Sequence, residues 1–187
     1  MTAENTPIQG LVRLRPRIFA DERGRFVVTF DQARFRELTG VSDAFVQDNE
    51  STSHAGVLRG LHFQLPPAAQ GKLVHVTRGA VLDVVVDLRP ESSTFGEHFK
   101  LRLDARDKEM LWVPPGFAHG FVALEDHTVF SYKCTAFYDP ALERCIRWDD
   151  RELGIDWEVE NPVVSAKDKV GGAFGERKWW PAGQGQA

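Results

Sequence analysis

The chain has 187 residues, of which 42% are hydrophobic and 27% are charged, and its formal net charge is −4. These values are typical of a globular protein with one full core, and the negative charge argues against a nucleic-acid binder that depends on a basic surface. The two cysteines, Cys134 and Cys145, follow no disulfide or metal spacing, which favours a reduced protein in the cytoplasm.

The N-terminal residues MTAENTPIQG contain no basic stretch followed by an apolar one, so we expect no secretory signal. No apolar run approaches the ~18 residues of a membrane span, and we expect no membrane partner.

The first clear element is a helix that Asp31 caps, QARFREL fills and Gly40 ends. Most of the remaining chain predicts short strands between turn residues. These strands are expected at 9–15, 24–30, 43–48, 57–64, 72–79, 81–88, 97–104, 109–113, 118–124, 127–137 and 144–148.

The segment 81–88 is apolar on both of its faces, which indicates a strand covered on both sides. Many short strands with few helices predict an all-β jelly roll or barrel. Residues 149–153 are expected to form one helical turn, and the tail after Lys169 to be irregular, with its last residues disordered. The pair Trp179 and Trp180 suits packing on the barrel or on a partner subunit, and the sequence does not choose.

Three segments bring together side chains that suit proton transfer. The stretch GVLRGLHFQLPPAAQGK places Arg59, His62 and Lys72 on two adjacent predicted strands, PPGFAHGF adds His119, and YKCT adds Tyr132. Imidazole is an apt base because its unperturbed pKa is about 6.5. A base, a phenolic acid and several cations together indicate proton movement on a carbonyl compound that carries phosphates.

Eight motifs occur in one order from about residue 12 to residue 169: GVLRGLHFQ, QGKLVHVTRGAVLDVVVDLR, STFG, WVPPGFAHGF, YKCTAFYDP, RWDD, IDW and SAKD. Together they resemble the dTDP-4-dehydrorhamnose 3,5-epimerase family, which acts in dTDP-L-rhamnose synthesis. The resemblance implies a cupin-type double-stranded β-helix with one or two short peripheral helices. It also implies a single domain over residues 1–187, working as a homodimer without metal or organic cofactor. An N-terminal arm of about residues 1–30 would contact the partner subunit.

The resemblance also implies catalytic roles. The substrate would be a nucleotide-linked 4-keto-6-deoxyhexose, whose C3 and C5 protons flank a ketone, so that removal of either proton gives an enolate. His62 matches the base, and Asp168 the carboxylate that orients it. Lys72 matches the positive charge near the ketone oxygen, and Tyr132 matches the acid that returns a proton on the opposite face.

Further residues match substrate contacts of the family. Arg59 has a planar fork suited to a diphosphate. The other expected contacts to nucleotide or sugar are Arg23, Phe26, Gln47, Asn49, His119, Tyr138, Glu143 and Lys167. One position departs from the family, because Val28 stands where a glutamate is usual in the RGxFxE segment. This departure bears on base or sugar selectivity more than on the reaction.

Two expectations concern local structure. Arg59 and His62 are three residues apart, so a regular strand would point them to opposite faces. Because both should face the pocket, we predict an irregularity at Gly60. Asp83 is expected to point inward, to take Lys72 or Arg59 as its partner, and to support catalysis.

Three alternative functions stay open. The first is an epimerase that acts at C3 or C5 only, or on another 4-keto sugar, which Val28 favours. The second is a metal-dependent cupin, because PPGFAHG contains a P-x-G-x-x-H pattern. However, Phe63 and Gln64 follow His62, leaving too few ligands for a typical iron or zinc site, so we expect no metal. The third is a non-catalytic sugar-nucleotide binding module, which would need the cations but not the His–Asp pair.

Overall fold

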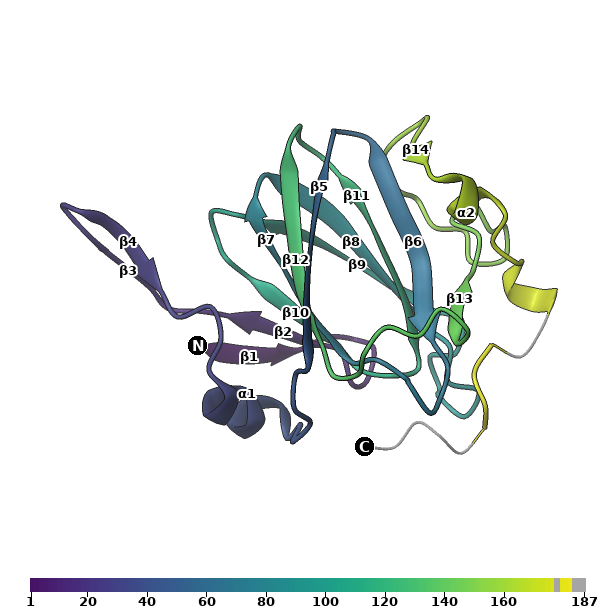
Figure 1. The fold of residues 1–187 in the computed structure, drawn as a ribbon, viewed down its shortest axis with the longest axis horizontal. Helices are drawn as coiled ribbons and strands as arrows, with labels where there is room; N and C mark the ends of the chain where they lie inside the picture. Colours follow the sequence, from purple (N-terminus) through teal and green to yellow (C-terminus); the bar gives the residue numbers. More distant parts are fainter. Residues whose placement is uncertain (177–178, 183–187) are drawn as a thin grey trace.

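The computed structural model describes residues 1–176 and 179–182, and within them it is built mainly of short strands (Figure 1). The strands are β1 (Thr2–Asn5), β2 (Val12–Arg15), β3 (Ile18–Asp21), β4 (Gly24–Val27), β5 (Gln47–Ser53), β6 (Val57–Gln64), β7 (Lys72–Arg78), β8 (Ala80–Asp87), β9 (His98–Asp104), β10 (Met110–Val113), β11 (Phe117–Ala123), β12 (Thr128–Cys134), β13 (Glu143–Cys145) and β14 (Val163–Val164). The helices are α1 (Gln32–Thr39), α2 (Ala166–Lys169) and the 3-10 helix η1 (Phe174–Glu176). No helix in this part of the chain has the length and apolar character needed to span a bilayer.

Two sheets form the body of the protein. The first has the strand order β1-β2-β10-β7-β12-β5, and the second has the order β13-β6-β11-β8-β9, with β14 added in parallel to β6. The other strand pairs between these elements are antiparallel. Successive strands from β5 onward often lie in different sheets, as the chain crosses between the two layers of a jelly roll. The predicted all-β jelly roll with short peripheral helices is confirmed.

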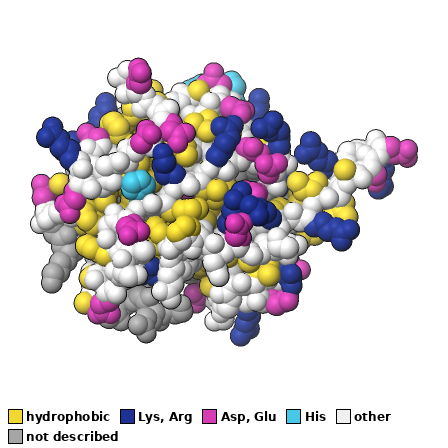
Figure 2. All heavy atoms as spheres, turned by 180° about the vertical axis from the view of Figure 1, so that it is seen from behind, with side chains coloured by type: hydrophobic (Ala, Val, Ile, Leu, Met, Phe, Trp, Pro, Cys, Tyr) yellow, Lys and Arg dark blue, Asp and Glu magenta, His cyan; other side chains and the backbone are white. Residues whose placement is uncertain are grey.

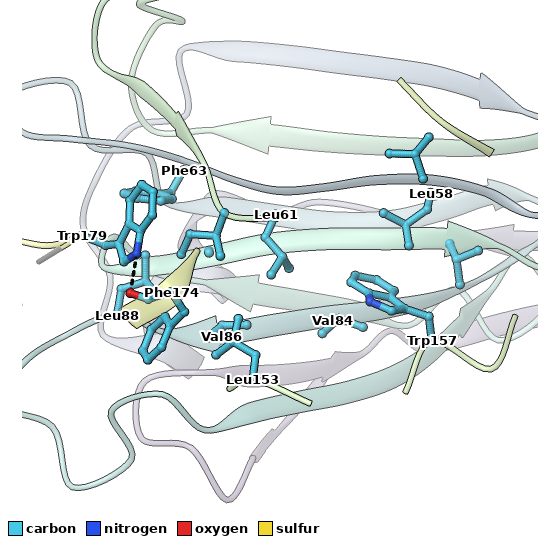
Figure 3. Packing of buried hydrophobic residues seen from close by; sticks show 14 of the residues in the cluster. Leu58, Leu61, Phe63, Val84, Val86, Leu88, Leu153, Trp157, Phe174 and Trp179 are labelled. Atoms are coloured by element: carbon cyan, nitrogen blue, oxygen red, sulfur yellow. Dashed lines mark hydrogen bonds between the residues drawn. The ribbon is translucent and has the colours of Figure 1, made fainter. Parts of the chain in front are cut away.

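Apolar clusters cover both faces of the central strands of each sheet, whereas the edge strands β1 and β5 are largely exposed. Between the sheets lies an apolar layer that includes Val85, Phe121 and Phe130. The outer face of the first sheet is covered at Trp112 by Phe35 of α1. The outer face of the second sheet is covered by the C-terminal segment, whose packing Figure 3 shows. Because both its faces are covered, β8 is buried along its whole length, as its apolar residues on both faces predicted.

The two C-terminal tryptophans pack on the body of the barrel. Trp179 and Trp180 are 5% and 3% exposed, and both belong to the apolar cluster on the second sheet. The Trp179 ring meets the Phe63 ring edge-on, and its indole N–H donates to the Phe174 carbonyl at 2.8 Å, as Figure 3 shows. The sequence left open whether the two tryptophans pack on the barrel or on a partner subunit, and the structure shows that they pack on the barrel of their own chain. The expected disorder of the last residues concerns 183–187, which lie outside the described part.

The predicted ends of helix α1 are correct, because capping residues determine them. Asp31 accepts from the Arg34 amide at the start of α1, and Gly40 ends the helix at φ +74°, as predicted. Strand β6 has the expected bounds. The prediction of a strand at 43–48 was wrong, because β5 covers Gln47–Ser53, and β1, β3 and β14 were not foreseen. At 149–153 the chain makes one turn closed by the Gly154 amide on the Asp150 carbonyl, without a helix.

A hairpin of β3 and β4 projects from the barrel (Figure 1). Within the expected arm over residues 1–30, β1 and β2 belong to the first sheet, and this hairpin is the part that projects. Phe19 and Phe26 are 46% and 65% exposed on it, with ring centroids 6.4 Å apart. Figure 2 shows apolar side chains on the hairpin next to basic and acidic ones.

Candidate active site

A cavity of about 470 Å³ opens among strands of both sheets and the segment that carries β14 and α2. Many of the residues singled out from the sequence line it: Arg59, His62, Lys72, His119, Tyr132, Lys167 and Asp168. Lys72 and Tyr132 come from β7 and β12 of the first sheet, whereas His62 comes from β6 of the second. The fold therefore sets an imidazole against an ammonium and a phenol that the opposite sheet provides.

His62 and Asp168 form a pair although they are 106 positions apart in the chain. The His62 Nε2 and Asp168 Oδ1 atoms lie 2.7 Å apart, and the aspartate is 3% exposed. Ser165 caps the short helix α2 by accepting from the Asp168 amide, which fixes the backbone at this residue. Burial opposes ionisation of Asp168, but hydrogen bonds, first of all from His62, outweigh it and lower the pKa of this carboxyl. The carboxylate can therefore hold the ring in a fixed orientation.

The predicted irregularity at Gly60 is confirmed. Between the paired positions His119–His62 and Phe121–Arg59, β6 advances three residues while β11 advances two. Gly60 takes φ +140°, and a Cβ on it would lie 2.5 Å from the Gly120 Cα atom, so only glycine fits at this position. The extra residue brings both Arg59 and His62 to the cavity wall.

Lys72 and Tyr132 are neighbours on the other side of the cavity. The Lys72 Nζ atom lies 5.9 Å from the centroid of the Tyr132 ring. Burial lowers the pKa of Lys72 and raises the pKa of Tyr132, because it disfavours the charged form of each group. The phenol therefore stays protonated at neutral pH and is ready to donate. An anion bound in the cavity would favour the ammonium form of Lys72.

Asp83 has a different partner from the one expected. Its Oδ2 atom lies 2.8 Å from Nε2 of His119, and the prediction of Lys72 or Arg59 as partner was wrong. The strand register explains this partner. Asp83 of β8 pairs with Phe121 of β11, and His119, which lines the cavity, lies two residues before Phe121 on the same face of β11. Asp83 is fully buried, and its Oδ1 atom has no hydrogen-bond partner among the described residues. It thus holds His119 from behind the cavity wall.

Among the residues expected to bind the nucleotide, Arg59 lies at the cavity, whereas Arg23 and Phe26 lie on the β3–β4 hairpin. The Arg59 guanidinium lines the cavity and donates to Ser53 Oγ at 3.2 Å. Arg23 and Phe26 lie on the projecting hairpin, away from the cavity of the same chain (Figure 1). Arg23 is paired there with Asp21.

The other expected substrate-contact residues form a network of hydrogen-bonded polar side chains beside the cavity. Gln47 donates to Asn49 Oδ1 at 2.8 Å and accepts from the Tyr138 amide at 2.9 Å. The Tyr138 hydroxyl donates to Glu143 Oε2 at 2.7 Å, and the same carboxylate pairs with Lys167. Burial alone would raise the pKa of Glu143, but the hydrogen bonds from Lys167 and Tyr138 lower it. Lys167 lines the cavity and, through its pair with Glu143, connects these hydrogen-bonded side chains to the cavity wall.

Two residues at the site escaped the sequence analysis. Ser51 lines the cavity, and its buried Oγ atom has no partner among the described residues. Its alternation with Gln47 and Asn49 on β5 was the available signal. Cys145 stands opposite His62 in the pairing of β13 with β6. Burial and then the Asp168 carboxylate raise the pKa of the Cys145 thiol to about 12.

Comparison with known proteins agrees with this geometry. The sequence model of the dTDP-4-dehydrorhamnose 3,5-epimerase family matches residues 5–176. The dTDP-4-dehydrorhamnose 3,5-epimerase of Pseudomonas aeruginosa is 48% identical over 182 residues, which are 97% of this chain and 100% of the relative. The solved structure of RmlC from Legionella pneumophila in complex with dTDP-4-keto-L-rhamnose has a TM-score of 0.92 at 43% identity, covering 98% of this chain and 99% of that one.

A more distant structure has a different specificity. ChmJ of Streptomyces bikiniensis, a 3'-monoepimerase in complex with dTDP-quinovose, has a TM-score of 0.84 at 34% identity, covering 90% of this chain and 85% of that one. The family match and the P. aeruginosa relative each extend over most of the sequence. This chain therefore belongs to the dTDP-4-dehydrorhamnose 3,5-epimerase family, whose cupin-type jelly roll it shares.

Proposed function

We propose that this protein is an isomerase that epimerises a dTDP-linked 4-keto-6-deoxyhexose at C3 and C5, as in dTDP-L-rhamnose biosynthesis. The observation that carries the proposal is the arrangement of one cavity. A carboxylate-paired imidazole lines it from one sheet, and an ammonium and a phenol line it from the other. An epimerase needs this opposition, because a proton must leave one face of the carbon and arrive at the other.

The first chemical step is abstraction of a proton. His62 takes the proton from the carbon next to the ketone, and the electron pair of the C–H bond moves into an enolate whose charge lies on the ketone oxygen. Asp168, 2.7 Å from the ring, stabilises the imidazolium that forms. The proton on His62 is afterwards released to solvent.

The second step returns a proton from the opposite side. Tyr132 donates its hydroxyl proton to the carbon, inverting the centre, and the phenolate then recovers a proton from solvent. Lys72 stabilises the enolate oxygen, because a fixed positive charge in a buried site acts strongly on developing negative charge. Arg59 offers its guanidinium to the diphosphate. Gln47, Asn49, His119, Tyr138, Glu143 and Lys167 contact the sugar or nucleotide.

We also propose that the functional unit is a cytoplasmic homodimer of single-domain chains. The hairpin carries Arg23 and Phe26 away from the cavity of its own chain, so these residues meet a nucleotide only at the site of a partner. The exposed rings of Phe19 and Phe26 supply apolar surface for such a contact. Both cysteines are unpaired, in keeping with a reducing compartment.

Isotope incorporation tests the function. Incubation with dTDP-4-keto-6-deoxyglucose in heavy water, with the product trapped by the downstream reductase, is expected to place deuterium at both C3 and C5. Nuclear magnetic resonance of the product reads the two positions separately. Deuterium at one position alone would identify a single-site epimerase. Its absence from both positions would favour a non-catalytic module that binds the sugar nucleotide.

A single-site epimerase is the second candidate. Val28 follows β4 at the position where the family usually has a glutamate, and ChmJ, which shares the fold, is a 3'-monoepimerase. The residues proposed for proton transfer are the same in both candidates. The heavy-water experiment separates them, because only the double epimerase exchanges both centres.

Replacing Asp83 with asparagine is expected to lower kcat about 10-fold, because a charge-assisted hydrogen bond to His119 becomes a weaker neutral one. KM is expected to change less, because Asp83 lies behind the cavity wall. Steady-state kinetics and the thermal unfolding midpoint are measured together. A variant with a lower midpoint but wild-type kcat would reduce Asp83 to a structural role.

A further inference from the structure

Cys145 lies beside the proposed catalytic pair, and the proposed proton transfers do not use it. It stands directly opposite His62 in the pairing of β13 with β6, and directly opposed residues of an antiparallel pair project to the same face of the sheet. The ligand atoms of His62, Asp168 and Cys145 all lie within 4.8 Å of one another. A nitrogen, an oxygen and a sulfur donor thus converge at one edge of the cavity.

This donor set has a chemical preference. Zinc binds imidazole nitrogen, carboxylate oxygen and thiolate sulfur at about 2.0–2.3 Å, so three such ligands around one ion lie roughly 3–4 Å apart. Small side-chain movements bring the three atoms to that spacing. The sulfur favours thiophilic cations such as Zn²⁺ and Cd²⁺ over Mg²⁺ and Ca²⁺, which prefer oxygen.

The surroundings hold the three donors in place. Asp168 is 3% exposed, and its second oxygen accepts from the Gly60 amide at 3.4 Å. Cys145 is partly buried, with its sulfur close to the carbonyls of Gly60 and Ile146. Two of the ligands therefore sit on paired strands and the third on a capped helix, which keeps the cost of ordering them low.

We propose that His62, Asp168 and Cys145 form an inhibitory site for a thiophilic divalent cation, with Zn²⁺ as the test ion. The cation displaces the thiol proton and binds Nε2 of His62 in place of the hydrogen bond to Asp168. The ring proton then moves from Nε2 to Nδ1, the nitrogen that would take the substrate proton, so the base is lost. Substrate turnover then stops, and removal of the ion restores it. The inhibition rests on the proposed role of His62, whereas binding of the ion does not.

The binding test is independent of catalysis. Metal-free protein is titrated with Cd²⁺, and the near-ultraviolet charge-transfer absorption of a cadmium–thiolate bond is recorded. We expect one equivalent to saturate the band in the wild-type protein and in the Cys134→Ser control, and the band to be absent from Cys145→Ser. A band that survives in Cys145→Ser, or none in the wild type, would overturn the site.

The inhibition test uses the active enzyme. Protein stripped with a chelator is expected to keep full turnover, to lose it on addition of Zn²⁺, and to regain it with fresh chelator. The zinc concentration for half inhibition should rise at least about 10-fold in Cys145→Ser and stay unchanged in Cys134→Ser. Equal sensitivity of the two variants would refute the inhibitory role. Loss of turnover on chelation, restored by zinc, would refute it too, and would separately contradict the proposed metal-free mechanism.

Discussion

Replacing His62 with alanine is expected to abolish both epimerisation and the exchange of substrate protons with solvent. The variant removes the only group of the proposed mechanism that takes a proton from carbon, and a positioned base contributes 10²–10⁴-fold, so we expect a loss of about 10³-fold. Washing of deuterium from heavy water into the recovered substrate measures exchange directly. Full exchange in this variant would show that another group is the base.

The alanine variant also leaves Asp168 buried without its ring partner, which lowers stability. His62→Gln serves as the matched control, because its side-chain amide nitrogen can take the place of Nε2 and donate to Asp168 but cannot act as a base near neutral pH. The two variants should therefore be equally inactive, while the glutamine variant unfolds at the higher temperature. Calorimetric titration with dTDP checks that both still bind the nucleotide.

Replacing Tyr132 with phenylalanine is expected to separate exchange from inversion. The ring keeps its position near Phe130 and Lys72, but the proton donor is lost. We expect epimerised product to form about 10²-fold more slowly. His62 would still remove a proton and return a deuteron to the same face, so the recovered substrate becomes labelled without inverting.

The ratio of labelled substrate to epimerised product is the measured quantity. It should rise strongly in Tyr132→Phe compared with the wild type, with little change in the unfolding temperature. Equal loss of labelling and product would place Tyr132 in substrate binding or in the first proton transfer instead. Lys72→Met gives a useful comparison, because loss of the enolate-stabilising charge should lower both quantities together.

The sequence predicts those parts of the fold where one side chain decides the local conformation. Asp31 and Gly40 set the ends of α1 through capping, and the apolar pattern of 81–88 indicates a strand covered on both faces. Strand β5 was misplaced because its residues, QDNESTS, are polar along their whole length, and tertiary pairing with β12 overrides their propensity. The short strands β1, β3 and β14 likewise exist because a partner strand is nearby.

The site was predictable in part and for a different reason. The pairing of His62 with Asp168 spans most of the chain, so only the resemblance to a known family pointed to it. The irregularity at Gly60 followed from the spacing of Arg59 and His62, together with the demand that both face the pocket. The partner of Asp83 and the place of Cys145 depend on strand register between distant segments, which the residues alone do not reveal.

The covering of the second sheet by residues that follow position 150 has a consequence for biosynthesis. Trp179 and Trp180 seal that sheet, and Asp168 reaches His62 from the same late stretch. A nascent chain that has just released residue 150 from the ribosome therefore carries an uncovered apolar layer and lacks the proposed carboxylate partner of its base. Protection from aggregation and competence for turnover arrive together, when the segment that carries Asp168, Trp179 and Trp180 folds back onto the second sheet.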